Sequence, residues 1–122
     1  MKNLKISEEL IKAVLQKETE TLSKDFNFTI NEDYIEFSDD GEMQFEYCIY
    51  KFAFKCKEWA YKQKRVNMFI VEADTEDSEI NVSVLYGEHH PNLKMHYFNK
   101  DNCEIKSTIE ACEWILENKD NK

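Results

Sequence analysis

A helical repeat of apolar residues over residues 42–65 most constrains how this chain can fold. No Gly or Pro interrupts the stretch, acids stand near its start, and bases near its end, where the helix dipole favours them. The pattern predicts a long central helix over residues 42–65, against which the other segments pack. The apolar positions that recur at steps of three and four are Phe45, Cys48, Ile49, Phe52, Ala53, Cys56, Trp59 and Ala60.

Shorter patterns on either side of this helix predict two more helices and five strands. An N-cap at Ser7 predicts a helix over about residues 8–16, and Ser107 to Glu110 is typical of a capping box that opens a last helix. Alternating apolar residues predict strands over 26–30, 34–37, 66–73, 80–86 and 93–97. The expected fold is α+β, in the order α-β-β-α-β-β-β-α, with a small antiparallel sheet packed with three helices.

The bulk properties predict a single domain over residues 1–122. A hydrophobic share of 42% within 122 residues is enough for a real core. No apolar run approaches the ~18 residues that a membrane-spanning helix needs. The first ten residues, MKNLKISEEL, lack the apolar centre of a signal peptide. We therefore expect a cytoplasmic protein with reduced cysteines and no membrane contact.

The net charge of −9 is unevenly distributed along the chain. Residues 26–46 carry seven acids and no base, residues 47–65 carry six bases and one acid, and residues 66–90 carry six acids and no base. The predicted central helix thus brings a basic band between two acidic segments. The net acidity disfavours general binding to nucleic acid backbones.

The segments FAFKCKEWAYKQ and STIEACEWILEN resemble those of small bacterial prophage proteins. The arrangement over residues 44–118 also resembles the phage ABA sandwich domain, in which helices enclose a small sheet. Thr108, Glu110 and Ala111 match the Thr-x-x-Glu-Ala-type helix start of that family only approximately in register. The resemblance implies a phage-associated origin and a fold, but it implies no activity and carries over no site residue.

Candidate metal or catalytic residues are few. His89, His90, His96 and Cys103 could form a zinc site or a Cys-His nucleophilic pair, yet their spacing matches no compact ligand pair. The acidic turn Asp74 to Glu79 has Glu79 where a calcium loop needs glycine. A solvated loop and an acidic solvated turn explain both segments more simply. We therefore expect no enzyme, no metal and no cofactor.

A second aromatic stripe marks the predicted central helix, interleaved with lysines. The simplest expectation is that it packs in the core, under the N-terminal helix or hairpin. The alternatives are a protein interface that includes self-association and a stack for single-stranded nucleic acid. Of the two binding roles we favour the protein interface. The stripe residues, and the tentative protein-binding site, are Tyr47, Tyr50, Phe54 and Tyr61, with Lys51, Lys57 and Lys64 between them.

The sequence carries no specific chemical signature, so the functional expectation is broad. We expect a non-enzymatic, prophage-type accessory protein that binds an unidentified protein partner. A second hypothesis is an acidic anti-defence inhibitor that mimics nucleic acid phosphates. A third is a small enzyme or zinc site around His89, His90, His96 and Cys103. The acids of the second hypothesis are Asp33, Glu36, Asp39, Asp40, Glu42, Asp74, Glu76, Asp77 and Glu79.

Overall fold

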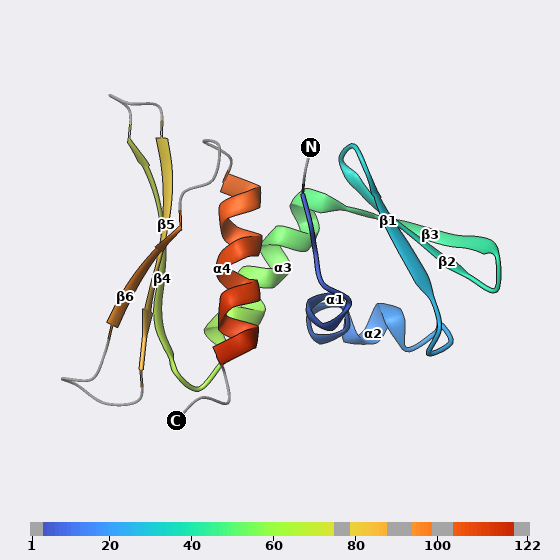
Figure 1. Cartoon of the computed structure of the whole chain (residues 1–122), viewed down its shortest axis with the longest axis horizontal. Coiled ribbons are helices and arrows are strands. Elements are labelled where there is room, and N and C mark those ends of the chain that lie inside the picture. Colours follow the sequence, from blue (N-terminus) through green and yellow to red (C-terminus); the bar gives the residue numbers. More distant parts are fainter. Residues whose placement is uncertain (1–3, 75–78, 88–93, 99–103, 119–122) are drawn as a thin grey trace. The chain divides into compact units, whose positions relative to one another are not determined.

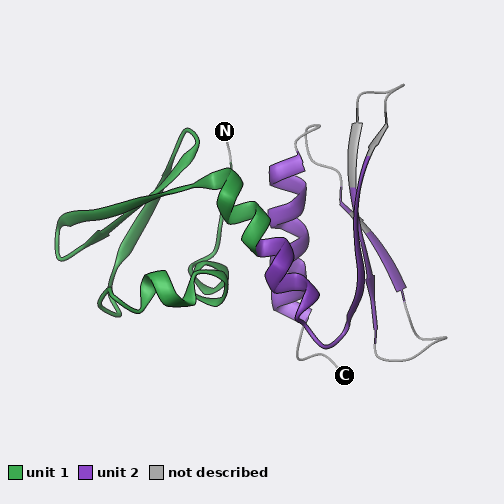
Figure 2. Ribbon diagram, turned by 180° about the vertical axis from the view of Figure 1, so that it is seen from behind, with its two compact units in different colours: residues 1–55 green, residues 56–122 purple. Residues whose placement is uncertain are grey.

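The chain divides into two compact units, shown in Figures 1 and 2 of a computed structural model. The N-terminal unit comprises residues 1–55 and the C-terminal unit residues 56–122. The structure describes residues 4–74, 79–87, 94–98 and 104–118. Helix α3 (Ile49–Tyr61) begins in the first unit and ends in the second.

Two short helices open the N-terminal unit, α1 (Glu8–Val14) and α2 (Gln16–Thr19). The predicted cap is confirmed, because the Leu10 amide donates a hydrogen bond of 3.1 Å to the Ser7 hydroxyl. The helical path breaks at Leu15, where φ is −103° and ψ is 47°. Leu10, Ile11 and Leu15 are fully buried and supply part of the core of this unit.

A three-stranded antiparallel sheet follows, which we call the N-terminal sheet. It consists of β1 (Asn27–Asn31), β2 (Tyr34–Asp39) and β3 (Glu42–Cys48), with β2 in the middle. Phe28, Phe37 and Phe45 face one another across the three strands, and Phe37 stacks on Phe45 with ring centroids 4.7 Å apart. Alternation along the strands sends this row inward and leaves the other face exposed.

The predicted central helix over residues 42–65 is corrected at both ends. Residues 42–48 form β3, and α3 begins at Ile49 and ends at Tyr61. The cause of the first correction is the preceding turn, where Asp40 has a φ of 56° and Gly41 a φ of 81°. Two residues with positive φ are typical of the tight turn that joins antiparallel strands, and Asp-Gly is a favoured sequence for it. The chain therefore turns back into the sheet before the helix begins.

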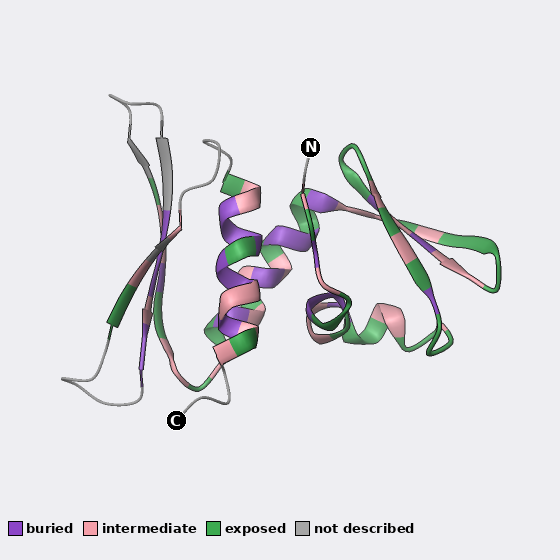
Figure 3. Ribbon diagram, viewed as in Figure 1, coloured by how far each residue is buried: buried purple, intermediate pink, exposed green. Residues whose placement is uncertain are grey.

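The C-terminal unit holds a second antiparallel sheet covered by a helix. The strands β4 (Val66–Asp74), β5 (Glu79–Tyr86) and β6 (Lys94–Phe98) lie in this order, and α4 (Glu104–Asn118) contacts all three. The Tyr86 hydroxyl donates a 2.6 Å hydrogen bond to the Asn118 carbonyl and ties β5 to the end of α4. Buried residues cover a broad side of α4 and exposed residues a narrower one (Figure 3), as expected for a helix with a wide inward face.

The α+β class is confirmed, and the eight predicted elements occur in the predicted order. Within the described residues, the structure adds the short helix α2 and the strand β3, and it forms two sheets where the sequence analysis expected one. The capping box at Ser107 is also corrected. α4 begins at Glu104, so Ser107 and Thr108 lie inside the helix and are buried. These small side chains fit a packed helix face as well as they fit a cap.

Candidate functional site

Three of the four predicted stripe residues lie on the exposed side of α3. Tyr50, Phe54 and Tyr61 keep 51%, 63% and 57% of their surface exposed. Their spacing of four and seven residues places them on one side of a single helix. We call these three residues the aromatic face. The residues on the opposite, buried side of α3 are Ile49, Phe52, Ala53, Cys56 and Ala60.

Tyr61 combines an exposed ring with a fixed hydroxyl. The hydroxyl donates a 2.7 Å hydrogen bond to the Phe69 carbonyl of β4, and the two rings lie 6.3 Å apart. The bond holds the ring in one orientation against β4. A ring held in this way loses little conformational entropy when a partner covers it.

Tyr47, the fourth predicted residue, lies elsewhere. It belongs to β3, where it pairs with Ile35, and it is half-buried. Its hydroxyl is buried and has no hydrogen-bond partner within the described part of the chain. Burial raises the pKa of Tyr47, although the nearby Lys55 ammonium acts in the opposite direction. The Lys51 ammonium lies 5.5 Å from the centre of its ring. Tyr47 therefore supports the start of α3 and is not part of the aromatic face.

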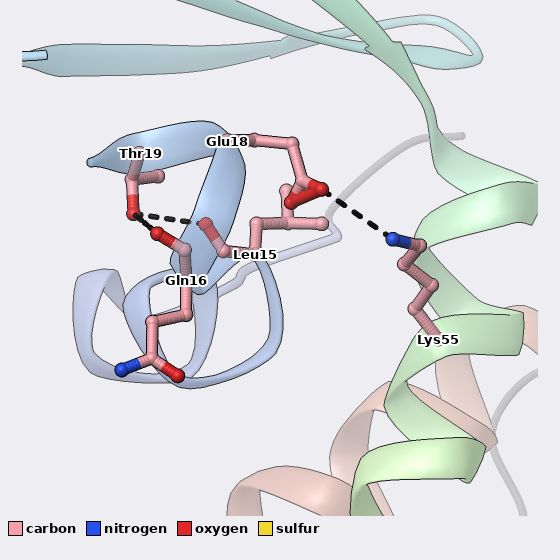
Figure 4. Close-up of polar contacts among 5 residues, drawn as sticks. All are labelled: Leu15, Gln16, Glu18, Thr19 and Lys55. Carbon is pink, nitrogen blue, oxygen red and sulfur yellow. Dashed lines mark hydrogen bonds and ion pairs between the residues drawn. The ribbon is translucent and has the colours of Figure 1, made fainter. Parts of the chain in front are cut away.

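Lysines accompany the aromatic face. Lys51 is exposed and Lys57 half-buried, whereas Lys55 lies 3.4 Å from the Glu18 carboxylate of α2 (Figure 4). The Thr19 hydroxyl donates to the carbonyls of Leu15 and Gln16 at 2.9 and 3.4 Å and steadies the short helix that presents Glu18. Among the described residues, neither Lys51 nor Lys57 has an ion-pair partner. Their charges are available to a partner.

The acids of the second hypothesis do not all share one role. Asp33, Asp40 and Glu42 are exposed, and the Asn31 amide donates a 2.8 Å hydrogen bond to Glu36. Asp39 accepts hydrogen bonds from the hydroxyl and the backbone amide of Ser23, and the hydroxyl bond is the larger reason that its pKa is lowered. Glu76 and Asp77, and the side chains of Asp74 and Glu79, lie outside the described residues.

Asp39 and Asp40 line a shallow hollow with a volume of about 580 Å³. The hydrogen bonds to Ser23 already engage both Asp39 oxygens, so Asp39 serves the structure of the chain. An open acidic hollow of this kind is typical of a solvated turn.

Most of the proposed zinc or nucleophile residues lie outside the described residues, namely His89, His90 and Cys103. His96 is described on β6, and its ring lies 4.1 Å from the Trp114 ring of α4. Across the described ranges, no three His, Cys, Asp or Glu side chains gather in a way that could hold a metal ion.

Two buried cysteines meet in the C-terminal unit. The Cys112 thiol donates to the Cys56 carbonyl at 3.4 Å, and both side chains are fully buried. Burial, and then the neighbouring Cys112 thiol, raises the pKa of Cys56 well above its ordinary value. A protonated, buried thiol is a poor nucleophile, so Cys56 acts as a core residue.

Sequence reasoning missed two exposed apolar side chains on the N-terminal sheet. Tyr34 on β2 and Met43 on β3 keep 47% and 60% of their surface exposed. The Asp40-Gly41 turn was the signal that could have placed Met43 on a strand. Because the sequence pattern assigns residues 42–48 to a helix, it does not predict that Met43 lies on a sheet.

No protein-family model matches the chain, no curated protein matches its sequence, and no solved structure matches it. Within the described ranges, the helices are too short or too polar to cross a membrane.

Proposed function

We propose that this chain is a non-enzymatic accessory protein that acts by binding another protein through the aromatic face of α3. The observation that carries the proposal is the exposure of Tyr50, Phe54 and Tyr61 on one side of one helix. Single exposed apolar residues are normal, but three large exposed aromatics on one side of one helix are more than scattered exposure explains.

The chemistry of these residues suits protein recognition. Aromatic side chains are enriched at protein interfaces and supply much of the binding energy there. Apolar anchors at helical spacing are also the way in which a helix occupies a groove of a partner. Lys51 and Lys57 add charges that would steer an acidic partner toward the same side.

The prophage-type origin and the cytoplasmic location belong to this proposal as well. The first is supported by the resemblance of residues 44–118 to small prophage proteins. The second is supported by the free thiols of the described residues Cys48, Cys56 and Cys112, since reduced cysteines are usual in the cytoplasm.

Affinity capture with matched variants tests the proposal. The immobilised chain is exposed to an extract of the bacterium that encodes it, beside a Tyr50→Ala/Phe54→Ala variant and a Met68→Ala/Met95→Ala control, whose two methionines are exposed on β4 and β6. Each pair removes two exposed apolar side chains, so their effects on stability should be similarly small. We expect a specific partner to be lost with the α3 variant and retained with the control. Capture that is equal for all three proteins would contradict the proposal.

A further inference from the structure

The outward face of the N-terminal sheet carries a pair of facing acids, of which Glu36 is half-buried and accepts a hydrogen bond from the Asn31 amide, and Glu46 is exposed. Glu36 of β2 lies directly opposite Glu46 of β3, and Thr29 of β1 completes the row. Like charges that face each other across strands destabilise a sheet. Neither glutamate has an ion-pair partner among the residues that the structure describes. This position would be stabilised by cations from outside.

Apolar side chains flank the two acids. Tyr34 lies two residues before Glu36 on β2, and Met43, which pairs with Ser38, precedes Glu46 on β3. Both are exposed. We call Tyr34, Glu36, Met43 and Glu46 the acidic sheet face. It combines apolar surface with negative charge.

The exposed side of α3 combines apolar surface with positive charge. Tyr50 and Phe54 supply the apolar surface, and Lys51 and Lys57 supply charges that are unpaired in the described chain. The two surfaces are complementary in sign and alike in apolar character. Most of these side chains are exposed in one copy, and Glu36 and Lys57 are half-buried. One copy therefore leaves both surfaces open to a partner.

We propose that the chain self-associates, the aromatic face and lysines of one copy docking on the acidic sheet face of a second copy. A second copy fits because the complementary charges are present on the chain itself. The net charge of −9 makes most approaches between copies repulsive, so this oppositely charged pairing is favoured over others. The contact joins unlike surfaces, so two copies pair reciprocally about a two-fold axis or successive copies associate head to tail.

This inference rests on the proposed function, because it names an occupant for the same helix face. Its first consequence is that self-association depends on the salt concentration. Charge pairs at an exposed interface are screened at high ionic strength, so association should weaken as salt is added. The apolar part of the contact should persist.

The experiment exchanges the charges of the two surfaces in two separate variants. Light scattering and sedimentation then measure the mass of each nuclease-treated protein in solution, alone and mixed. One variant reverses the helix charges, Lys51→Glu/Lys57→Glu, and the other reverses the sheet charges, Glu36→Lys/Glu46→Lys. We expect the native chain to exceed its monomer mass of 14.6 kDa as concentration rises. Each variant alone should lose association by about tenfold or more, because its own two surfaces then carry the same sign. An equimolar mixture of the two variants should regain it.

Restoration in the mixture also shows that both variants are folded. Phe54→Ala gives a second test without charge changes, and it should weaken association of the native chain. A native chain that stays at 14.6 kDa at its solubility limit would overturn the inference, as would a mixture that stays monomeric while both variants keep the native circular dichroism. The proposed function fails separately, since partner capture that depends on Tyr50 and Phe54 needs no self-association.

Discussion

At the residue scale, the stability of the N-terminal unit depends on Phe37. This ring is fully buried, stacks on Phe45 at 4.7 Å and lies 5.9 Å from Phe26. Phe37→Ala should lower the free energy of unfolding by about 3–5 kcal/mol, because it removes buried surface and leaves a cavity. Phe54→Ala deletes the same side chain at an exposed position and should change stability by no more than about 0.5 kcal/mol. Urea melts of both variants measure the difference, and equal losses would show that Phe54 is part of the core.

A second prediction at the residue scale concerns Cys56, which makes the free energy of unfolding depend on pH. Its pKa is raised in the folded chain, chiefly by burial, so the unfolded chain releases this proton at a lower pH than the folded chain. The stability due to this protonated thiol is complete below the ordinary pKa of 9.0 and is lost as pH rises above it. The loss is at most about 1.4 kcal/mol per pH unit. Between pH 8 and 10, Cys56→Ala should show a shallower decline than the native chain in urea melts. If stability declines equally with pH in both proteins, titratable groups other than Cys56 cause the decline.

At the scale of elements, the Asp40-Gly41 turn joins β2 to β3 and so places residues 42–48 in the sheet. Gly41 has a φ of 81°, a conformation that side chains disfavour, although a Cβ atom there would meet no neighbour within 4 Å. Gly41→Ala should therefore destabilise by about 1 kcal/mol through backbone strain alone. Asp40→Asn keeps a residue that tolerates positive φ and should leave stability within about 0.5 kcal/mol. Thermal melts compare the two, and a neutral Gly41→Ala would mean that the turn adopts another form.

At the scale of the whole molecule, α3 belongs to both units. The sequence analysis predicts one domain, and this prediction can be tested because both tryptophans, Trp59 and Trp114, lie in residues 56–122. Their fluorescence reports the C-terminal unit, whereas far-ultraviolet circular dichroism reports helices and strands of both. We expect the two signals to give one coincident urea transition, because unfolding either unit removes support from one part of α3. Two separate transitions would mean that the units unfold independently.

The sequence by itself determined the class of the fold and much of its order. Ser7 as a cap, the strands before residue 40 and the inward residues Phe52 and Cys56 were predictable, because caps and periodicity act over a few neighbouring residues. The sequence pattern identifies the three aromatics as a stripe but favours core packing for them, and their exposure shows that this interpretation is wrong.

The tertiary structure decided the rest. Phe45 and Tyr47 fit a helical repeat and a strand equally well, and only their pairing with Phe37 and Ile35 across β2 selects the strand. The same pairing brings Glu46 opposite Glu36, a neighbourhood that no local pattern predicts. Periodicity records which residues avoid water, whereas the partner that covers each one depends on contacts between residues distant in sequence.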